Sequence, residues 1–243
     1  MNATLGILRN TSLAADSVRA VADRASASAF AGLRWSPDAF ATEQLHGLVR
    51  QVFFSGGPRP PRQVVFTAID DSPEMARICT RVAETLASQV PGNVCVVEAN
   101  SHSPMLHNCF GGNDVKEMRY AEQFDPRNGA QQIARNLWFV PADAFLGNNG
   151  NPFFADHLRS RLSELGRQFE YTLIHASPAG SCSEAALIGQ LSDGVILGLE
   201  AHRTRRIAAR ITKERLQAAN VRLLGVVLNQ RTFPIPEGIY RKL

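Results

Sequence analysis

Three apolar runs of this sequence end in polar side chains of types that do chemistry. The first run is followed by the letters "DDSPE", the second by Glu98 and Asn100, and the third by His175. Carboxylates and imidazoles transfer protons and bind metal ions, and a turn between a strand and a helix often binds phosphate. What these groups do together depends on whether the fold brings the three ends close to one another.

The turn after the first run has the topology of a phosphate-binding loop without its chemistry. Such a loop holds phosphates with glycine N–H groups and a lysine, and holds magnesium with a Ser or Thr hydroxyl. Here Ser72 and Glu74 stand in place of the glycines, and Met75 and Ala76 occupy the lysine and hydroxyl positions. The sequence therefore predicts poor affinity for a nucleotide.

The acids of this turn have a structural explanation, because the start of a helix leaves four N–H donors without partners. Asp71 with Glu74 fits a capping box, and Ser72 with Pro73 at the first helical position fits equally well. A bound triphosphate would also lie close to these carboxylates and to Asp70, each contact costing on the order of 1 kcal/mol. We expect the protein to supply its own anion here.

Composition is that of a soluble globular protein, with 44% hydrophobic and 20% charged residues among 243. No apolar run approaches the roughly 20 residues of a membrane-spanning helix, and no signal peptide is evident, so we expect a cytoplasmic location. The four cysteines form no C-x-x-C pair and predict neither a zinc site nor disulfides.

A metal site built from His102, His107, His175 and Glu98 lacks any H-x-x-x-H or similar spacing. We therefore expect no metal, and expect His175 to be hydrogen-bonded within the protein. Cys182 is a candidate reactive thiol, but no adjacent residue identifies a base for it, which favours a packing role.

Apolar and helical segments alternate along most of the chain, which predicts an α/β fold with a doubly wound, mostly parallel sheet and helices on both faces. The predicted strands are 64–68, 93–98, 137–141, 171–175, 194–199 and 223–228. The predicted helices are 42–53, 73–89, 103–110, 153–169, 184–191 and 204–219, with a weak pattern over 13–30. We expect a loosely structured extension over residues 1–40 and one domain over 41–243.

Four motifs, in order, carry a family resemblance: "VFTAIDDSPEMARICTRVAETLA", "VCVVEANSHSPMLHNCFG", "YTLIHASPAG" and "LLGVVLNQ". Together they resemble the cytoplasmic tyrosine-kinase domains of bacterial capsule and exopolysaccharide systems (CpsD/CapB type), which belong to the P-loop ATPases. The resemblance implies a P-loop NTPase-like fold. It also places Glu98 and Asn100 where the family has two catalytic aspartates, and His175 where it has the magnesium-organising aspartate. Asn229 falls where the family contacts adenine.

By this resemblance we expect a non-catalytic pseudo-ATPase that acts as a binding or regulatory module in polysaccharide biosynthesis or export. No cofactor is expected. The implied partner is a membrane-bound chain-length or copolymerase protein, or an active kinase paralogue, which would recruit the chain to the inner face of the membrane. A homo-oligomer is left as an open alternative. The family's ring-forming helix has an acid and two arginines; Glu43 matches the acid, but His46 and Val49 stand where the arginines would be.

Two alternatives stay open at this point. The first is an active, ATP- and magnesium-dependent protein tyrosine kinase with an atypical site built from Glu98, His175 and Asn229. The second is a partitioning-type protein whose basic helix near Arg203–Arg210 binds DNA or lipid. A solvated helix face explains that basic segment more simply, and we do not expect a nucleic-acid partner.

Overall fold

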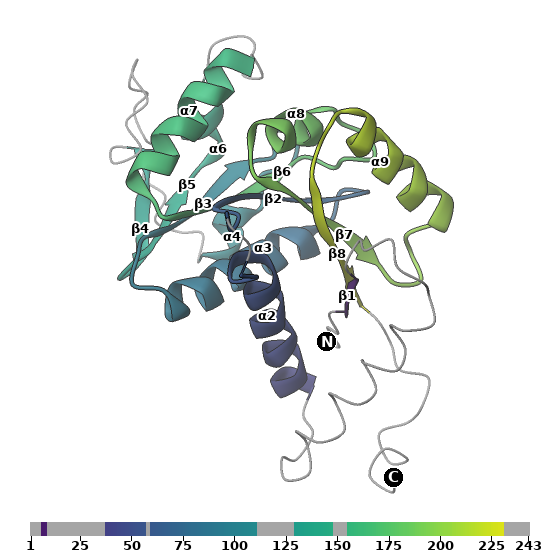
Figure 1. Ribbon diagram of the computed structural model, residues 1–243, viewed down its shortest axis with the longest axis horizontal. Helices are drawn as coiled ribbons and strands as arrows, with labels where there is room; N and C mark the ends of the chain where they lie inside the picture. The colour runs from purple at the N-terminus through teal and green to yellow at the C-terminus, as the bar shows by residue number, and fades with distance from the viewer. Residues whose placement is uncertain (1–5, 9–36, 57–58, 111–128, 148–154, 231–243) are drawn as a thin grey trace, which may run out of the picture.

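An eight-stranded sheet forms the centre of the computed structural model, which describes residues 6–8, 37–56, 59–110, 129–147 and 155–230 (Figure 1). The strand order is β1-β8-β7-β2-β6-β3-β5-β4, and the six strands from β8 to β5 run parallel. The strands are β1 (Gly6–Leu8), β2 (Gln63–Ala68), β3 (Val94–Ala99), β4 (Gln131–Ala134), β5 (Leu137–Val140), β6 (Tyr171–Ala176), β7 (Gly194–Glu200) and β8 (Leu223–Asn229).

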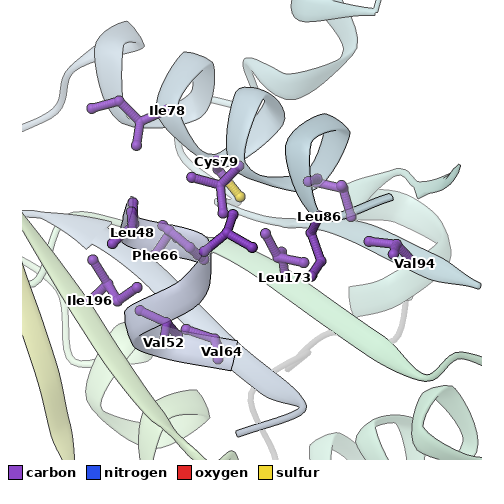
Figure 2. Close-up of a cluster of buried hydrophobic side chains, with 14 of the residues drawn as sticks. Leu48, Val52, Val64, Phe66, Ile78, Cys79, Leu86, Val94, Leu173 and Ile196 are labelled. Atoms are coloured by element: carbon purple, nitrogen blue, oxygen red, sulfur yellow. The ribbon is translucent and has the colours of Figure 1, made fainter. Parts of the chain in front are cut away.

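One face of the sheet is covered by α2 (Pro37–Phe53), α3 (Pro73–Gln89) and α4 (Leu106–Cys109) (Figure 1). Figure 2 shows the underside of α3, with Cys79 and Leu86, lying over Phe66 of β2 and Leu173 of β6. Leu48 of α2 joins the same cluster. This packing positions α3, the helix that follows β2.

The opposite face is covered by α6 (Ala142–Leu146), α7 (Ala155–Gln168), α8 (Glu184–Leu191) and α9 (Arg206–Ala218). Every residue of β3 and β6 is buried, since helices cover both of their faces. Parallel strands buried on two faces read as continuous apolar runs, which is why the sequence showed them. The predicted doubly wound α/β fold is confirmed.

Element boundaries agree with the sequence except at short or polar segments. The helices α3 and α8 begin and end as predicted, whereas α2 begins at Pro37 and α4 is four residues long. The sequence did not predict β1, β4 or α6. The weak helical pattern over residues 13–30 lies outside the described residues.

Two elements lie within the expected loose extension over residues 1–40. Residues 6–8 form β1, which pairs antiparallel with β8, and α2 begins inside the proposed extension at Pro37. The domain boundary itself stays a prediction.

Among the described residues, no helix is long and apolar enough to cross a lipid bilayer.

The two fully buried cysteines supply a test of this packing. Burial raises the pKa of the Cys79 and Cys95 thiols well above their ordinary value, and the charge of Glu98 adds to the effect at Cys79. Because the thiolate is the reactive form, iodoacetamide at neutral pH should label half-buried Cys182 in the folded protein and leave Cys79 and Cys95 unlabelled. Peptide mapping before and after denaturation measures this. Labelling of Cys95 in the folded protein as fast as that of Cys182 would contradict the fold.

Candidate functional site

The start of α3 is capped by the protein's own groups. Ser72 is the N-cap residue, and its Oγ accepts a hydrogen bond from the Glu74 N–H at 3.3 Å. The Met75 N–H donates to the Ser72 carbonyl at 3.3 Å, and Pro73 has no N–H to donate. The structure therefore selects the Ser72–Pro73 cap over the Asp71–Glu74 capping box, and the first donors of the helix are already used.

A carboxylate from β7 completes this cap. The Ser72 hydroxyl donates a hydrogen bond to Glu200 Oε1, at the end of the neighbouring strand. Glu200 in turn accepts a hydrogen bond from Arg203 at 3.1 Å. A helix N-terminus attracts an anion, and the Glu200 carboxylate reaches this one through the Ser72 hydroxyl.

The positions after the cap are turned into the core. Met75 is only 3% exposed, and Ala76 is fully buried. The methionine sulfur lies against Gly198 of β7, where an added Cβ would come within 2.5 Å of it. Glycine at 198 is thus the residue that lets the Met75 side chain lie flat on the sheet.

A shallow hollow remains beside this turn, with a volume of about 20 Å³, room for about one water molecule. Three carboxylates line it: those of Asp70, Glu74 and Glu200. Asn229, at the end of β8, lines it too and is 3% exposed. Neither atom of its side-chain amide has a hydrogen-bond partner within the described part of the chain.

Glu98 and His175 form a buried pair at the ends of β3 and β6. The two residues are register partners in the parallel ladder, and Glu98 Oε1 lies 2.8 Å from His175 Nδ1. Both side chains are almost fully buried. The Nδ1–H group of His175 donates this hydrogen bond to the carboxylate, and both the neutral and the charged imidazole can make it.

The Glu98 carboxylate also orders the turn that follows β3. Its Oε2 accepts hydrogen bonds from the N–H groups of Met105 and Leu106, both at 2.8 Å. Its Oε1 accepts a further bond from the Asn100 N–H at 3.1 Å. These bonds place the start of α4 and satisfy a carboxylate that would otherwise be costly to bury.

Asn100 acts as a turn organiser. Its Oδ1 accepts hydrogen bonds from the N–H groups of His102 and Ser103, each at 3.2 Å, and lies 3.2 Å from the buried Ser177 Oγ. The Ser177 hydroxyl also contacts Glu184 Oε2. The turns after β3 and β6 are therefore joined through side chains.

No protein-family model matches the chain. The tyrosine-protein kinase CpsD of Streptococcus agalactiae serotype III is 34% identical over 62 residues, which are 26% of this chain and 27% of that kinase. The chain thus aligns with about a quarter of the length of the curated relatives that it matches.

Solved structures match over most of the chain. The chimerical protein CapA2B2 has a TM-score of 0.67 at 16% identity, covering 79% of this chain and 85% of that one. The kinase domain of the Escherichia coli tyrosine kinase ETK has a TM-score of 0.66 at 15% identity, covering 81% and 79%. The chain has the fold of bacterial tyrosine-kinase domains. The expected resemblance and the P-loop NTPase-like fold are confirmed.

A plasmid partition protein matches the chain less closely than these two structures do. A plasmid partition protein from Borrelia burgdorferi has a TM-score of 0.53 at 15% identity, covering 76% of this chain and 88% of that one. The comparison does not favour the partitioning alternative.

The fold gathers the residues singled out in the sequence into two groups. Ser72, Glu74, Met75 and Asn229 surround the hollow at the start of α3, with Ala76 just behind it in the core. The second group is the buried network of Glu98, Asn100 and His175. As expected, His175 is hydrogen-bonded within the protein.

Sequence reasoning missed two carboxylates near the site, those of Glu200 and Glu184. Glu200 ends the apolar run of β7 as Glu98 ends that of β3, so a polar residue at a strand end was the available signal. Glu184 begins α8 and carried no motif. The histidine cluster considered from the sequence is divided, since His175 pairs with Glu98 whereas His102 lies with Glu184 and Cys182.

Removing the Glu98 carboxylate should destabilise the protein strongly. Glu98→Ala leaves the Met105, Leu106 and Asn100 N–H groups without their acceptor, and each buried unpaired group costs about 1–3 kcal/mol. We expect the free energy of unfolding to fall by about 3–5 kcal/mol in urea titrations. Glu98→Gln, which keeps one acceptor oxygen, should lose distinctly less. Equal losses for the two variants would show that the hydrogen bonds are not the cause.

Proposed function

We propose that the chain is a non-catalytic relative of the exopolysaccharide tyrosine kinases, a pseudo-ATPase that serves as a binding or regulatory module. The observation that carries the proposal is the start of α3. Ser72 and Glu200 occupy the end of the helix at which a P-loop protein holds phosphate. Buried Met75 stands where, by resemblance, the phosphate-binding lysine belongs.

The electrostatics of the hollow support the same proposal. Three carboxylates line it, and a triphosphate would meet their like charges, while Met75 and Ala76 occupy the lysine and hydroxyl positions that would offset them in a P-loop. Its volume also falls far short of the roughly 300 Å³ that small-molecule sites usually offer. By resemblance, His175 stands at the position of the family's magnesium-organising aspartate, and its Nδ1 is hydrogen-bonded to Glu98.

One observation favours the alternative of a surviving nucleotide-dependent kinase. The amide of Asn229 is buried at the hollow with both of its polar atoms unpaired among the described residues. Buried amides normally find partners, so a ligand that supplies a donor and an acceptor would satisfy it. An adenine edge has this pattern, and by resemblance this is the adenine contact of the family.

Binding of Mg-ATP separates the two proposals. For the pseudo-ATPase we expect isothermal titration calorimetry to detect no micromolar binding and Mg-ATP to leave the melting temperature unchanged, because a ligand stabilises the folded state only if it binds there. Asn229→Ala should then behave like the parent chain. Micromolar affinity that is abolished by Asn229→Ala would overturn the pseudo-ATPase proposal and support the kinase.

The partner we propose, on the strength of the resemblance, is a membrane-bound polysaccharide chain-length or copolymerase protein, or an active kinase paralogue. Such a partner would recruit the chain from the cytoplasm to the inner face of the membrane. Assembly through the i, i+3, i+6 positions of α2 is not supported, because Val49 is fully buried in the core.

Partner binding should not depend on nucleotide. We expect the purified chain to bind the cytoplasmic segment of the chain-length protein, or the kinase paralogue, from its own organism with the same affinity, within about twofold, with and without Mg-ATP. Surface plasmon resonance with both candidates measures this. Binding that requires Mg-ATP would support the kinase alternative, and binding to neither candidate would refute the proposed role.

A further inference from the structure

A second cluster of reactive side chains lies outside the hollow and outside the Glu98–His175 pair. It consists of His102 from the turn after β3, Cys182 from the loop after β6 and Glu184 from the first turn of α8. Each offers one ligand atom, and these atoms all lie within 4.8 Å of one another. The Nδ1 atom of His102 is 3.7 Å from Glu184 Oε2.

We propose that His102, Cys182 and Glu184 bind a divalent transition-metal ion, with zinc as the best chemical match. An imidazole nitrogen, a thiolate and a carboxylate are the three ligand types that zinc takes in proteins. Magnesium and calcium prefer oxygen ligands alone, so the cysteine argues against both. Three protein ligands leave one position of a tetrahedral ion open to solvent or to a further ligand.

The geometry is close to what zinc requires. Bonds of about 2.0–2.3 Å place the ligand atoms of a tetrahedral ion roughly 3.3–3.8 Å apart. The 3.7 Å between His102 and Glu184 already falls in this range. A closure of about 1 Å brings the most distant pair of atoms into it, and His102 is exposed and Cys182 half-buried, so neither is locked in place.

Hydrogen bonds from neighbouring residues orient the cluster. The fully buried Ser177 hydroxyl contacts Glu184 Oε2, and the same hydroxyl is tied to Asn100. The Ser101 hydroxyl lies 3.2 Å from His102 Nδ1, a contact that must give way when this nitrogen binds the ion, and 3.5 Å from Glu184 Oε1, where it remains as an outer contact. Outer hydrogen bonds of this kind fix the ligands of metal sites and tune their affinity.

The cluster also lies where a parallel sheet binds its ligands. Its residues follow β3 and β6, the neighbouring strands whose carboxyl ends carry Glu98 and His175. None of its three residues lines the hollow at the start of α3. The metal proposal therefore stands independently of whether the chain binds a nucleotide.

The first experiment measures metal content. The full chain is stripped with a chelator, incubated with zinc, separated from free ion and analysed by mass spectrometry for metal per chain. We expect one zinc ion per chain, held with micromolar or tighter affinity against a chromophoric chelator. Substitution with cobalt(II) should give a thiolate-to-cobalt charge-transfer band, because the cysteine is a ligand.

Variants then assign the ligands. Cys182→Ser, His102→Ala and Glu184→Gln should each weaken zinc binding by about tenfold or more. Glu184→Gln keeps an oxygen that accepts the hydrogen bond from Ser177. Its loss of zinc affinity therefore reports on the charge of the ligand and not on the fold. Matched controls are Cys109→Ser and His107→Ala, which change a half-buried cysteine and histidine outside the cluster and should bind as the parent does.

Three outcomes would overturn the proposal. The first is the absence of stoichiometric zinc at micromolar concentration. The second is a loss of affinity in the two controls equal to that in the cluster variants. The third is a cobalt charge-transfer band that survives Cys182→Ser. Melting temperatures measured without metal identify any variant that fails to fold, and the cobalt band of the parent chain tests the site without any variant.

Discussion

The buried carboxylate of Glu98 constrains the whole carboxyl edge of this sheet. An ionised carboxylate without partners is too costly to bury, so the fold surrounds it with donors. The donors come from three places: His175 on β6, the Asn100 N–H in the adjoining turn, and the two N–H groups at the start of α4. One side chain thus fixes the contact of β3 with β6 and the point at which α4 begins.

The same electrostatic principle governs the start of α3. The positive end of a helix is stabilised by an anion, whether the anion is a bound phosphate or a side chain. In this chain the Glu200 carboxylate supplies it through the Ser72 hydroxyl, and Met75 fills the space that Gly198 leaves open. Internal capping and phosphate binding compete for the same donors, which is the physical basis for proposing a binding role without phosphoryl transfer.

Sequence reasoning found the elements whose signals are local and strong. The central parallel strands are continuous apolar runs. The helix α3 begins with a serine and a proline that directly follow such a run in the sequence. The edge strand β4 has the letters "QQIA" and alternates exposed and half-buried residues, so its pattern was too short and too polar to distinguish it from a loop. The helix α4 was predicted too long because nothing in its own sequence shows that the Glu98 carboxylate accepts hydrogen bonds from the N–H groups at its start.

By itself, the sequence determined the fold class, the start of α3 beside Ser72 and the placing of Glu98, Asn100 and His175 at strand ends, because these depend on periodicity and on residues near one another in the chain. It left two caps open for that helix start, and the structure chose Ser72. The tertiary structure decided the partners. Glu98 meets His175 across 77 positions, and Ser72 meets Glu200 across 128. His102 joins Cys182 and Glu184 instead of the other histidines. Strand order and register select these pairs, and both are set by packing the whole sheet between its two layers of helices.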